Sequence, residues 1–341
     1  MGNIRKIEKV WKSKPTVEGA GVHLRRAFGF HEVPQLDPFL LLDDFHSDNP
    51  KDYLPGFPWH PHRGIETITY VLHGRVEHGD SMGNKGTISS GDVQWMTAGS
   101  GIIHQEMPEG SKNGLMWGFQ LWANLPQSQK MMDPRYRDVT SPQIPEVTLK
   151  MGVKVKIICG MVNGVSGPVK DIVIDPEYID VSMPSKTAFT HPVKSGHTLF
   201  AYVIEGKGYF DQGRNSYAHE VIASNYFDTF DGAKPQFSNR GKKRRSVSTL
   251  SIPRASDRGV EWVDFKRECL IGAENLVFYS QDGDQVAVTT EETPVRFLLV
   301  SGKPIGEPVA WYGPIVMNTQ EELRIAFEEY AKGTFIKYKG K

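Results

Sequence analysis

The sequence predicts an all-β protein made of two copies of one strand-rich unit. It contains 34 glycines and 22 prolines among 341 residues, and turn residues at this density favour sheets joined by short loops over helical bundles. Between the turns lie short segments in which apolar and polar residues alternate, such as residues 67–72 and 117–122. Alternation with a period of two is typical of strands that bury one face.

An internal repeat indicates the duplication. The segment YVLHG at residues 70–74 recurs as YVIEG at residues 202–206, at an offset of 132. Gly91 and the strand predicted after it match Gly272 and residues 276–279, at an offset of 181. The difference of 49 residues measures an insertion in the second copy, at about residues 214–271. We therefore expect one domain over residues 1–147 and a second over residues 148–341.

Two features of the second copy stand outside the repeat. Residues 319–331 predict a short C-terminal helix, because Thr319 and Glu322 form a capping box. Its apolar face consists of Leu323, Ala326, Phe327 and Tyr330, and we expect this face to pack against a barrel. The insertion carries four consecutive basic residues at 242–245, which predict a solvated loop, with a nuclear-import or polyanion-binding patch as the alternative.

Composition excludes several classes of protein. Formal net charge is zero and the pI is about 7.2, so no overall charge favours direct binding to nucleic acid or to an anionic membrane. No window approaches 18 apolar residues, and the basic first 16 residues lack the apolar core of a signal peptide. Two cysteines rule out a disulfide framework and fit a reducing compartment. We expect a cytoplasmic monomer, or a nuclear one in a eukaryote.

Within the first copy, two pairs of residues of metal-binding types lie before residues 70–74 and after Gly91, the positions that define the repeat. His60 and His62 form one pair, and His104 and Glu106 form the other. Residues i and i+2 of a strand share a face, and the intervening 41 residues leave room for several short strands of a closed barrel. If the pairs lie on neighbouring strands, three imidazoles and one carboxylate converge. The alternative is that these groups hydrogen-bond one another in a polar core.

The donor types narrow the choice of metal. Mixed imidazole and carboxylate ligation suits Fe(II), Mn, Ni, Cu or Zn. The absence of a nearby thiolate in the sequence argues against a structural zinc site. Three histidines and one glutamate leave two positions open in an octahedral shell, as a reaction with dioxygen or a chelating substrate requires. Non-heme Fe(II) is therefore the leading choice, with other divalent metals as alternatives.

Longer segments carry a family resemblance. Residues 60–86, HPHRGIETITYVLHGRVEHGDSMGNKG, and residues 91–108, GDVQWMTAGSGIIHQEMP, resemble the signature segments of the pirin family within the cupin superfamily. Residues 297–323 resemble the C-terminal segment of the same family. The resemblance implies two cupin-type β-barrels packed face to face, a bicupin, with one iron in the N-terminal barrel. It implies His60, His62, His104 and Glu106 as the ligands.

Glu66 is a rival for the carboxylate position. General cupins take a carboxylate ligand shortly after the second histidine, and Glu66 stands in that place. In the pirin pattern the position is not a ligand. We therefore favour Glu106 and expect Glu66 to orient a ligand histidine or the guanidinium of Arg63.

The second copy is expected to be metal-free. The offset of 132 places Pro192 and Lys194 where His60 and His62 stand, and no histidine follows His219. The scaffold turns recur without the donors, which indicates that the fold does not require the histidines. His73 and His78 are expected at a turn, facing water.

The resemblance leaves the function between two classes. Pirins are associated with quercetin 2,3-dioxygenase activity, which implies a flavonol-like chelating substrate, dioxygen, and Glu106 as general base. Candidate pocket walls are Phe57, Trp59, Trp95 and Met96. Pirins in eukaryotes are also associated with iron-dependent binding of nuclear transcription factors, which implies a redox-sensing module with a protein partner. A third alternative is an enzyme for another small substrate, with quercetin as a surrogate.

Overall fold

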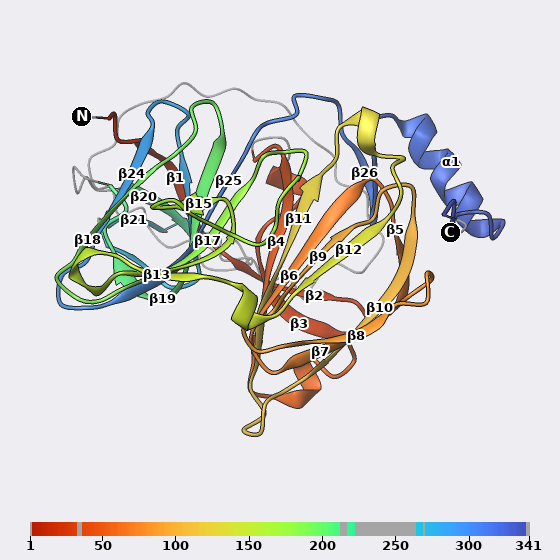
Figure 1. The fold of residues 1–341 in the computed structure, drawn as a ribbon, viewed down its shortest axis with the longest axis horizontal. Helices are drawn as coiled ribbons and strands as arrows, with labels where there is room; N and C mark the ends of the chain where they lie inside the picture. The colour runs from red at the N-terminus through yellow and green to blue at the C-terminus, as the bar shows by residue number, and fades with distance from the viewer. Residues whose placement is uncertain (1, 33–35, 212–216, 222–263, 269, 339–341) are drawn as a thin grey trace, which may run out of the picture.

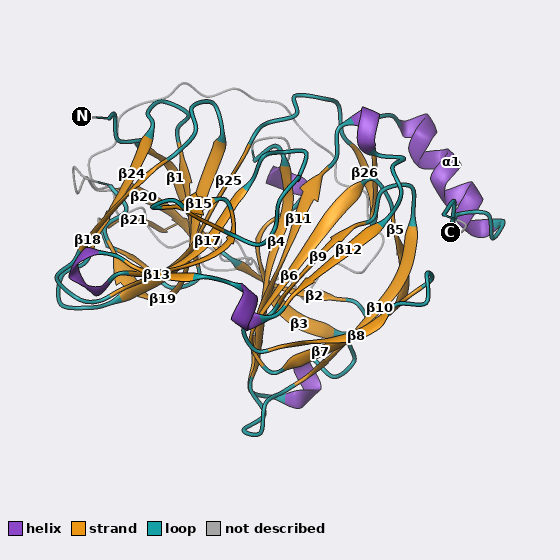
Figure 2. Ribbon diagram, in the orientation of Figure 1, coloured by secondary structure: helices purple, strands orange, loops and turns teal. Residues whose placement is uncertain are grey.

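The computed structural model describes residues 2–32, 36–211, 217–221, 264–268 and 270–338. In this part of the chain strands dominate, with one α-helix and a few short 3₁₀ turns (Figure 2). The prediction of an all-β fold is confirmed. The basic cluster at residues 242–245 and most of the predicted insertion lie outside the described residues. No helix of the described part is long and apolar enough to cross a membrane.

Two sheets form the first barrel (Figure 1). The larger sheet runs in the order β12 (Arg135–Val139), β9 (Val93–Thr97), β6 (Ile65–His73), β11 (Met116–Asn124), β4 (Phe39–Ser47), β3 (Val22–Phe28) and β2 (Lys14–Glu18). The smaller sheet runs in the order β5 (Phe57–His62), β10 (Ile102–Glu109), β7 (Arg75–Asp80) and β8 (Lys85–Ser89).

The second barrel is built mainly on a ten-stranded sheet. Its order is β13 (Glu146–Thr148), β14 (Lys154–Cys159), β17 (Glu177–Met183), β25 (Val295–Gly302), β19 (Thr198–Gly208), β23 (Asn275–Tyr279), β1 (Ile7–Lys12), β20 (Tyr217–Val221) and β21 (Asp264–Glu268), with β22 (Ile271–Gly272) on β19. Two further pairs are β18 (Ala188–Pro192) with β24 (Gln285–Thr289) and β15 (Met161–Val162) with β16 (Val165–Ser166).

The N-terminal strand belongs to the second barrel, and the C-terminal hairpin packs on the first barrel. Strand β1 pairs with β23 and β20 of the second barrel, although it precedes the first barrel in sequence. The C-terminal hairpin of β26 (Ala310–Tyr312) and β27 (Ile315–Met317) returns to the first barrel, where Ile315 bridges Arg63. The boundary expected at residues 147 and 148 stays a prediction, but each barrel is completed by a segment from the other end of the chain.

The C-terminal helix α1 (Gln320–Ala331) follows this hairpin at the outer edge of the molecule (Figure 1). The predicted capping box is confirmed: Thr319 Oγ1 accepts the Glu322 backbone N–H at 3.1 Å, and the Glu322 carboxylate accepts the Thr319 N–H at 2.9 Å. Leu323 and Ala326 are buried against the hairpin. The helix therefore caps the first barrel through β26 and β27.

The larger sheets of the two barrels pack face to face across a shared apolar core. Phe119 from β11 and Phe200 from β19 both lie in it. The repeat counterparts Tyr70 and Tyr202 each donate a hydrogen bond across this junction, to Asp180 and Asp44 respectively, both at 2.8 Å. This arrangement confirms the predicted face-to-face bicupin.

The two aspartates of this junction differ in their partners. Asp180 accepts two hydrogen bonds from the guanidinium of Arg296, at 3.0 and 2.7 Å. Among the described residues, the donors to Asp44 are neutral: the Tyr202 hydroxyl and the Trp117 indole N–H, the latter at 3.1 Å. Burial raises the pKa of Asp44 to about 7, and these two hydrogen bonds oppose the shift only in part.

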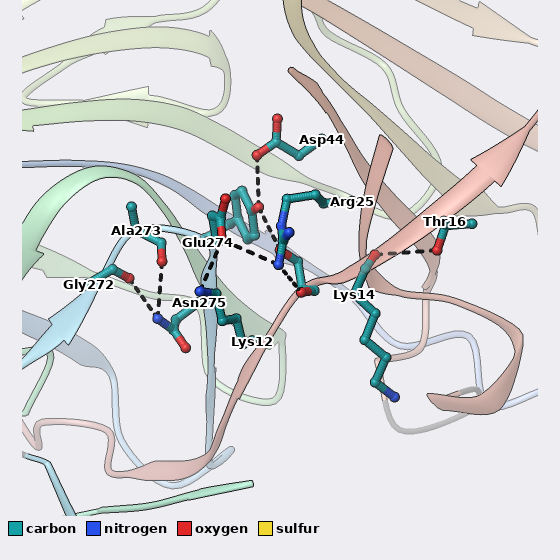
Figure 3. Close-up of polar contacts among 11 residues, drawn as sticks. Lys12, Lys14, Thr16, Arg25, Asp44, Gly272, Ala273, Glu274 and Asn275 are labelled. Atoms are coloured by element: carbon teal, nitrogen blue, oxygen red, sulfur yellow. Dashed lines mark hydrogen bonds and ion pairs between the residues drawn. The ribbon is translucent and has the colours of Figure 1, made fainter. Parts of the chain in front are cut away.

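Arg25, the cation that acts electrostatically on Asp44, pairs with another carboxylate. Arg25 forms an ion pair with Glu274 at 3.3 Å, and Lys12 pairs with the same carboxylate at 3.2 Å (Figure 3). Glu274 also raises the pKa of Asp44 further, whereas Arg25 lowers it only as the smallest of the causes. Asp44 is consequently a buried acid that forms no direct ion pair with a cation in the part of the chain that the structure describes.

Candidate metal centre

The four candidate ligands come from two neighbouring strands of the smaller sheet. Strand β10 pairs with β5, which sets His104 opposite His60. Strand β5 lies at the edge of its sheet, where a proline such as Pro61 removes no required ladder hydrogen bond. His60 and His62 therefore keep the two-residue strand period that directs both to one face.

The three imidazoles converge. Their ligand nitrogens lie within 4.8 Å of one another. The ring centroids are 4.8 Å apart for His60 and His62, 4.4 Å for His60 and His104, and 4.9 Å for His62 and His104. Among the described residues this is the one group of three or more His, Cys, Asp or Glu side chains found with converging donor atoms.

Backbone carbonyls define the tautomers of two of these rings. His60 Nδ1 lies 2.8 Å from the Pro58 oxygen, and His62 Nδ1 lies 3.1 Å from the Pro314 oxygen. A carbonyl only accepts, so each Nδ1 carries the proton and each Nε2 presents a lone pair. These two Nε2 atoms face each other at 3.1 Å. Lone pairs in this arrangement repel unless a cation lies beside them, so the pair fits a metal ion.

His104 supports the same conclusion. Both of its ring nitrogens are buried, and neither bonds to another described protein group. Burial lowers the pKa of His62 and His104 well below the ordinary value, and the neighbouring histidines lower it further. A neutral imidazole is the form that binds a metal. The surroundings of His62 and His104 therefore keep these two imidazoles in the form that binds a metal.

Glu106 lies beside the three histidines without joining them. Its carboxylate accepts hydrogen bonds from Thr69 Oγ1 at 3.2 Å and from Gln120 Nε2 at 3.0 Å. A cavity of about 20 Å³ borders Glu106, Gln120, Thr69 and Phe57, which is room for about one water molecule. The role of Glu106 as a ligand stays a prediction, although it projects from the same face of β10 as His104.

Gln120 is a site residue that the sequence did not reveal. The Trp122 indole N–H donates to Gln120 Oε1 at 2.9 Å, so the amide nitrogen must face Glu106. The alternation over residues 117–122 placed these two side chains on one face of a strand. It could not show that this face lies beside Glu106, because that depends on which strands are neighbours.

Replacing Gln120 by leucine is expected to weaken metal binding by about 10–100-fold, the usual effect of losing a residue that orients a ligand. The variant removes the N–H that holds the Glu106 carboxylate. Isothermal titration of the metal-free protein with Co(II) measures the change. Gln105→Leu is the matched control, because Gln105 lies between the two candidate ligands of β10 and projects from the opposite face of the strand.

The Glu66 side chain projects from the face of β6 that points toward the second barrel, so it cannot orient a ligand histidine as expected. It shares a face of β6 with Ile68 and Tyr70, which point into the core between the barrels. Its carboxylate accepts a hydrogen bond from Thr97 Oγ1 at 2.6 Å. The expectation that it orients a ligand histidine or Arg63 was wrong, since Arg63 pairs instead with Glu329 at 2.8 Å.

The expectation that His78 faces water was also wrong. His78 is buried on β7, directly opposite Glu106 in the sheet. Its imidazole lies over Gly86 of β8, where a Cβ atom would approach its Nε2 atom to 2.6 Å. The ring stacks on Tyr136 with the centroids 5.8 Å apart. His73, by contrast, is exposed as predicted.

The predicted pocket walls divide into three groups. Phe57 borders the cavity beside Glu106, and Met96 packs inside the first barrel with Ile65. Trp59 is 52% exposed. Trp95 lies in the core between the barrels, so its prediction as a wall of this pocket was wrong.

An aromatic group that the sequence did not single out borders the site. The Trp122 ring meets His62 edge to face, with centroids 5.0 Å apart. Trp311 of the C-terminal hairpin lies 6.0 Å from Trp122. The C-terminal hairpin therefore contributes to the surroundings of a candidate metal ligand.

The second barrel places different groups at the matching positions. Pro192 and Lys194 are exposed, and Lys194 pairs with Asp175 on the surface. The neighbouring His191 bonds to Glu177 at 2.7 Å. The interior is filled by apolar side chains, including Phe189, Phe210, Phe297, Val155 and Ile157.

Comparisons with known proteins agree with this architecture. The Pirin family model matches residues 21–123, and the Pirin C-terminal cupin domain model matches residues 261–336. A pirin-like protein of Caulobacter vibrioides is 39% identical over 97% of this chain and 99% of its own length. A Pseudomonas aeruginosa protein, whose name gives quercetin 2,3-dioxygenase as a provisional activity, is 35% identical over 98% of this chain and 99% of its own.

The solved structures include a quercetin 2,3-dioxygenase from Acinetobacter baumannii. It superposes with a TM-score of 0.75 at 26% identity, over 98% of this chain and 99% of that one. The matched family models cover both barrels, and the similarity to the relatives extends over nearly the whole chain. The chain therefore belongs to the pirin family.

Proposed function

We propose that this protein is a non-heme iron dioxygenase of the quercetin 2,3-dioxygenase type, acting on a chelating enol or enolate. The observation that carries the proposal is the pair of Nε2 lone pairs of His60 and His62, facing each other at 3.1 Å beside the unpartnered imidazole of His104. The quercetin 2,3-dioxygenase named among the similar structures supports the same class of reaction.

Four residues would hold one Fe(II) per chain in the first barrel. His60, His62 and His104 supply neutral imidazoles, and Glu106 supplies a carboxylate. This donor set resembles the mixed nitrogen and oxygen sites of non-heme iron oxygenases. When bound, the metal supplies Lewis acidity toward a chelating enol and a centre for reaction with dioxygen.

The side chains around the site perform the remaining tasks. A carboxylate oxygen of Glu106 would accept the enol proton of the substrate, and Gln120 and Thr69 hold that carboxylate by donating hydrogen bonds to it. Ile65 and Met96 are fully buried and pack with Ile102, two residues before His104 on β10. The chain would thus provide a base and apolar packing close to one of the candidate ligands.

Aerobic incubation of quercetin with the iron-loaded protein is expected to remove the flavonol absorbance. Glu106→Gln should slow this reaction by about 10²–10⁴-fold, the usual contribution of a positioned base. Absorbance spectroscopy under single-turnover conditions measures both rates. Turnover no faster than that of the metal-free protein would contradict the dioxygenase proposal. A panel of other chelating enols in the same assay would show whether quercetin is a surrogate for another substrate.

A second candidate function is an iron-dependent binding protein whose metal oxidation state controls a partner. The cavity of about 20 Å³ beside Glu106 favours it, because pockets for drug-sized ligands are usually about 300–1,000 Å³. A pull-down that captures a partner from one oxidation state only, and loses it on deletion within residues 214–271, would support this candidate. Equal capture of the partner by the oxidised and the reduced protein would contradict this candidate.

A further inference from the structure

The C-terminal hairpin is bonded directly to the residues that follow His62. The Val316 N–H donates to the Arg63 carbonyl at 3.1 Å, and the two strands meet at the bridge between Arg63 and Ile315. The buried ammonium of Lys130 donates to the carbonyls of Gly64 at 2.9 Å and Val316 at 3.1 Å. A Cβ atom at Gly64 would collide with the Val316 carbonyl. The hairpin and the ligand-bearing strand therefore fit closely.

The backbone carbonyl of Pro314 connects the hairpin to His62, a ligand in the proposed function. Its carbonyl accepts the Nδ1 proton of His62, and it is the group that sets the tautomer of that ring. The carbonyl belongs to the turn between β26 and β27. A shift of the hairpin would therefore remove the bond that directs His62 Nε2 toward the other two imidazoles.

The side chain of Arg63 connects the strand that bears His62 to helix α1. This side chain is 2% exposed, and Nη1 pairs with Glu329 of α1 at 2.8 Å. Nη2 donates to the Phe335 carbonyl at 2.8 Å, and the guanidinium lies 4.2 Å from the centre of the Phe335 ring. Nε donates to the Ser100 carbonyl at 2.7 Å. A buried guanidinium is costly without partners, so Arg63 holds the helix and the end of the chain in place.

We propose that Arg63 is a positioning residue for the metal site. Through Arg63, the docking of the C-terminal segment, from the β26–β27 hairpin to Phe335, determines the affinity of the site for metal. Arg63 adjoins His62 in the chain, and its partners Glu329 and Phe335 belong to the segment that supplies the Pro314 carbonyl. Undocking this segment displaces His62 and weakens metal binding. The inference rests on the metal site of the proposed function. It deepens that function by naming what regulates the site.

Charge reversal on α1 provides the test. In Glu329→Lys, like charges replace the ion pair with Arg63, and we expect Co(II) to bind about 10–100-fold more weakly. The ligand-field absorption of the bound Co(II) should also change, because His62 is displaced. The matched control is Glu328→Lys, one residue earlier on the same helix, where the ion pairs of the carboxylate within the described residues are with the surface residues Arg324 and Lys332. This control should bind Co(II) within about twofold of the wild type.

A second variant guards against a general folding defect. Phe335→Leu keeps the apolar bulk and the backbone carbonyl but removes the ring beneath the guanidinium, and it should weaken Co(II) binding by about threefold. Limited proteolysis of the full chain reports whether the C-terminal segment is released. A released segment with wild-type Co(II) affinity and spectrum would overturn the inference while leaving the metal site intact. Failure of the wild type itself to bind Co(II) would overturn the proposed function and this inference together.

Discussion

His62→Ala is expected to abolish metal binding, reducing Co(II) or Fe(II) affinity by more than about 100-fold. Changes in residues that merely orient a ligand already cost about 10–100-fold, and His62 is expected to bind the metal itself. Metal analysis of protein purified without added metal gives the first measurement. Thermal unfolding gives the second, since a saturating ion at about 100 times its dissociation constant stabilises the folded state by about 2.7 kcal/mol. The wild type should gain this stability, and the variant should not.

His73→Ala is the control for this variant, because His73 is exposed at the end of β6 and has no place in the histidine group. The variant at position 62 should still fold, since the second barrel forms with Lys194 at the matching position of the repeat. Equal metal content in the wild type and His62→Ala would show that the three histidines are not the site.

The convergence of the histidines could be predicted because it depends on a local rule. A strand directs residues i and i+2 to one face, so His60 and His62 had to lie together if the segment formed a strand. Only the pairing of β5 with β10 was needed to add His104. The same rule places Glu66 with Ile68 and Tyr70. It does not say whether that face lines the interior of the barrel or the junction between barrels, and this is why the expected role of Glu66 was wrong.

The contribution of the C-terminal segment could not be predicted by such rules. Pro314 lies 252 residues after His62 and acts through its backbone carbonyl, which any residue would supply. His78 was misplaced for a related reason. Histidines near glycines usually face water in turns, but Gly86 on the neighbouring strand leaves room for the imidazole to lie inside the barrel. Contacts of this kind depend on which strands become neighbours in the fold and on backbone atoms, which are the same in every residue.

The junction between the barrels provides the last prediction, Asp44→Asn. Native Asp44 has a pKa of about 7, well above its usual value, so the folded state holds a proton that the unfolded chain has lost. Ionisation of Asp44 therefore lowers the free energy of unfolding of the wild type as the pH rises from about 4 to 7, and this single group contributes up to about 1.4 kcal/mol for each pH unit. Asparagine is neutral throughout and still offers an oxygen to Tyr202 or Trp117. We expect the stability of Asp44→Asn relative to the wild type to rise with pH over this window and to level off above about pH 7.

Urea unfolding of both proteins at pH 5, 6, 7 and 8 measures this difference, and groups that titrate alike in the two proteins cancel. Asp180→Asn is the matched comparison across the junction. Asp180 pairs with Arg296, so removing its charge leaves a partly buried guanidinium without this partner and should destabilise the protein by up to about 3–5 kcal/mol, the upper range being that of fully buried pairs. A pH-dependent difference at Asp44, and a loss of stability at Asp180, would follow from the arginine pair that Asp180 has and Asp44 does not. A pH-independent difference at Asp44 would instead mean that the carboxylate stays ionised between the barrels.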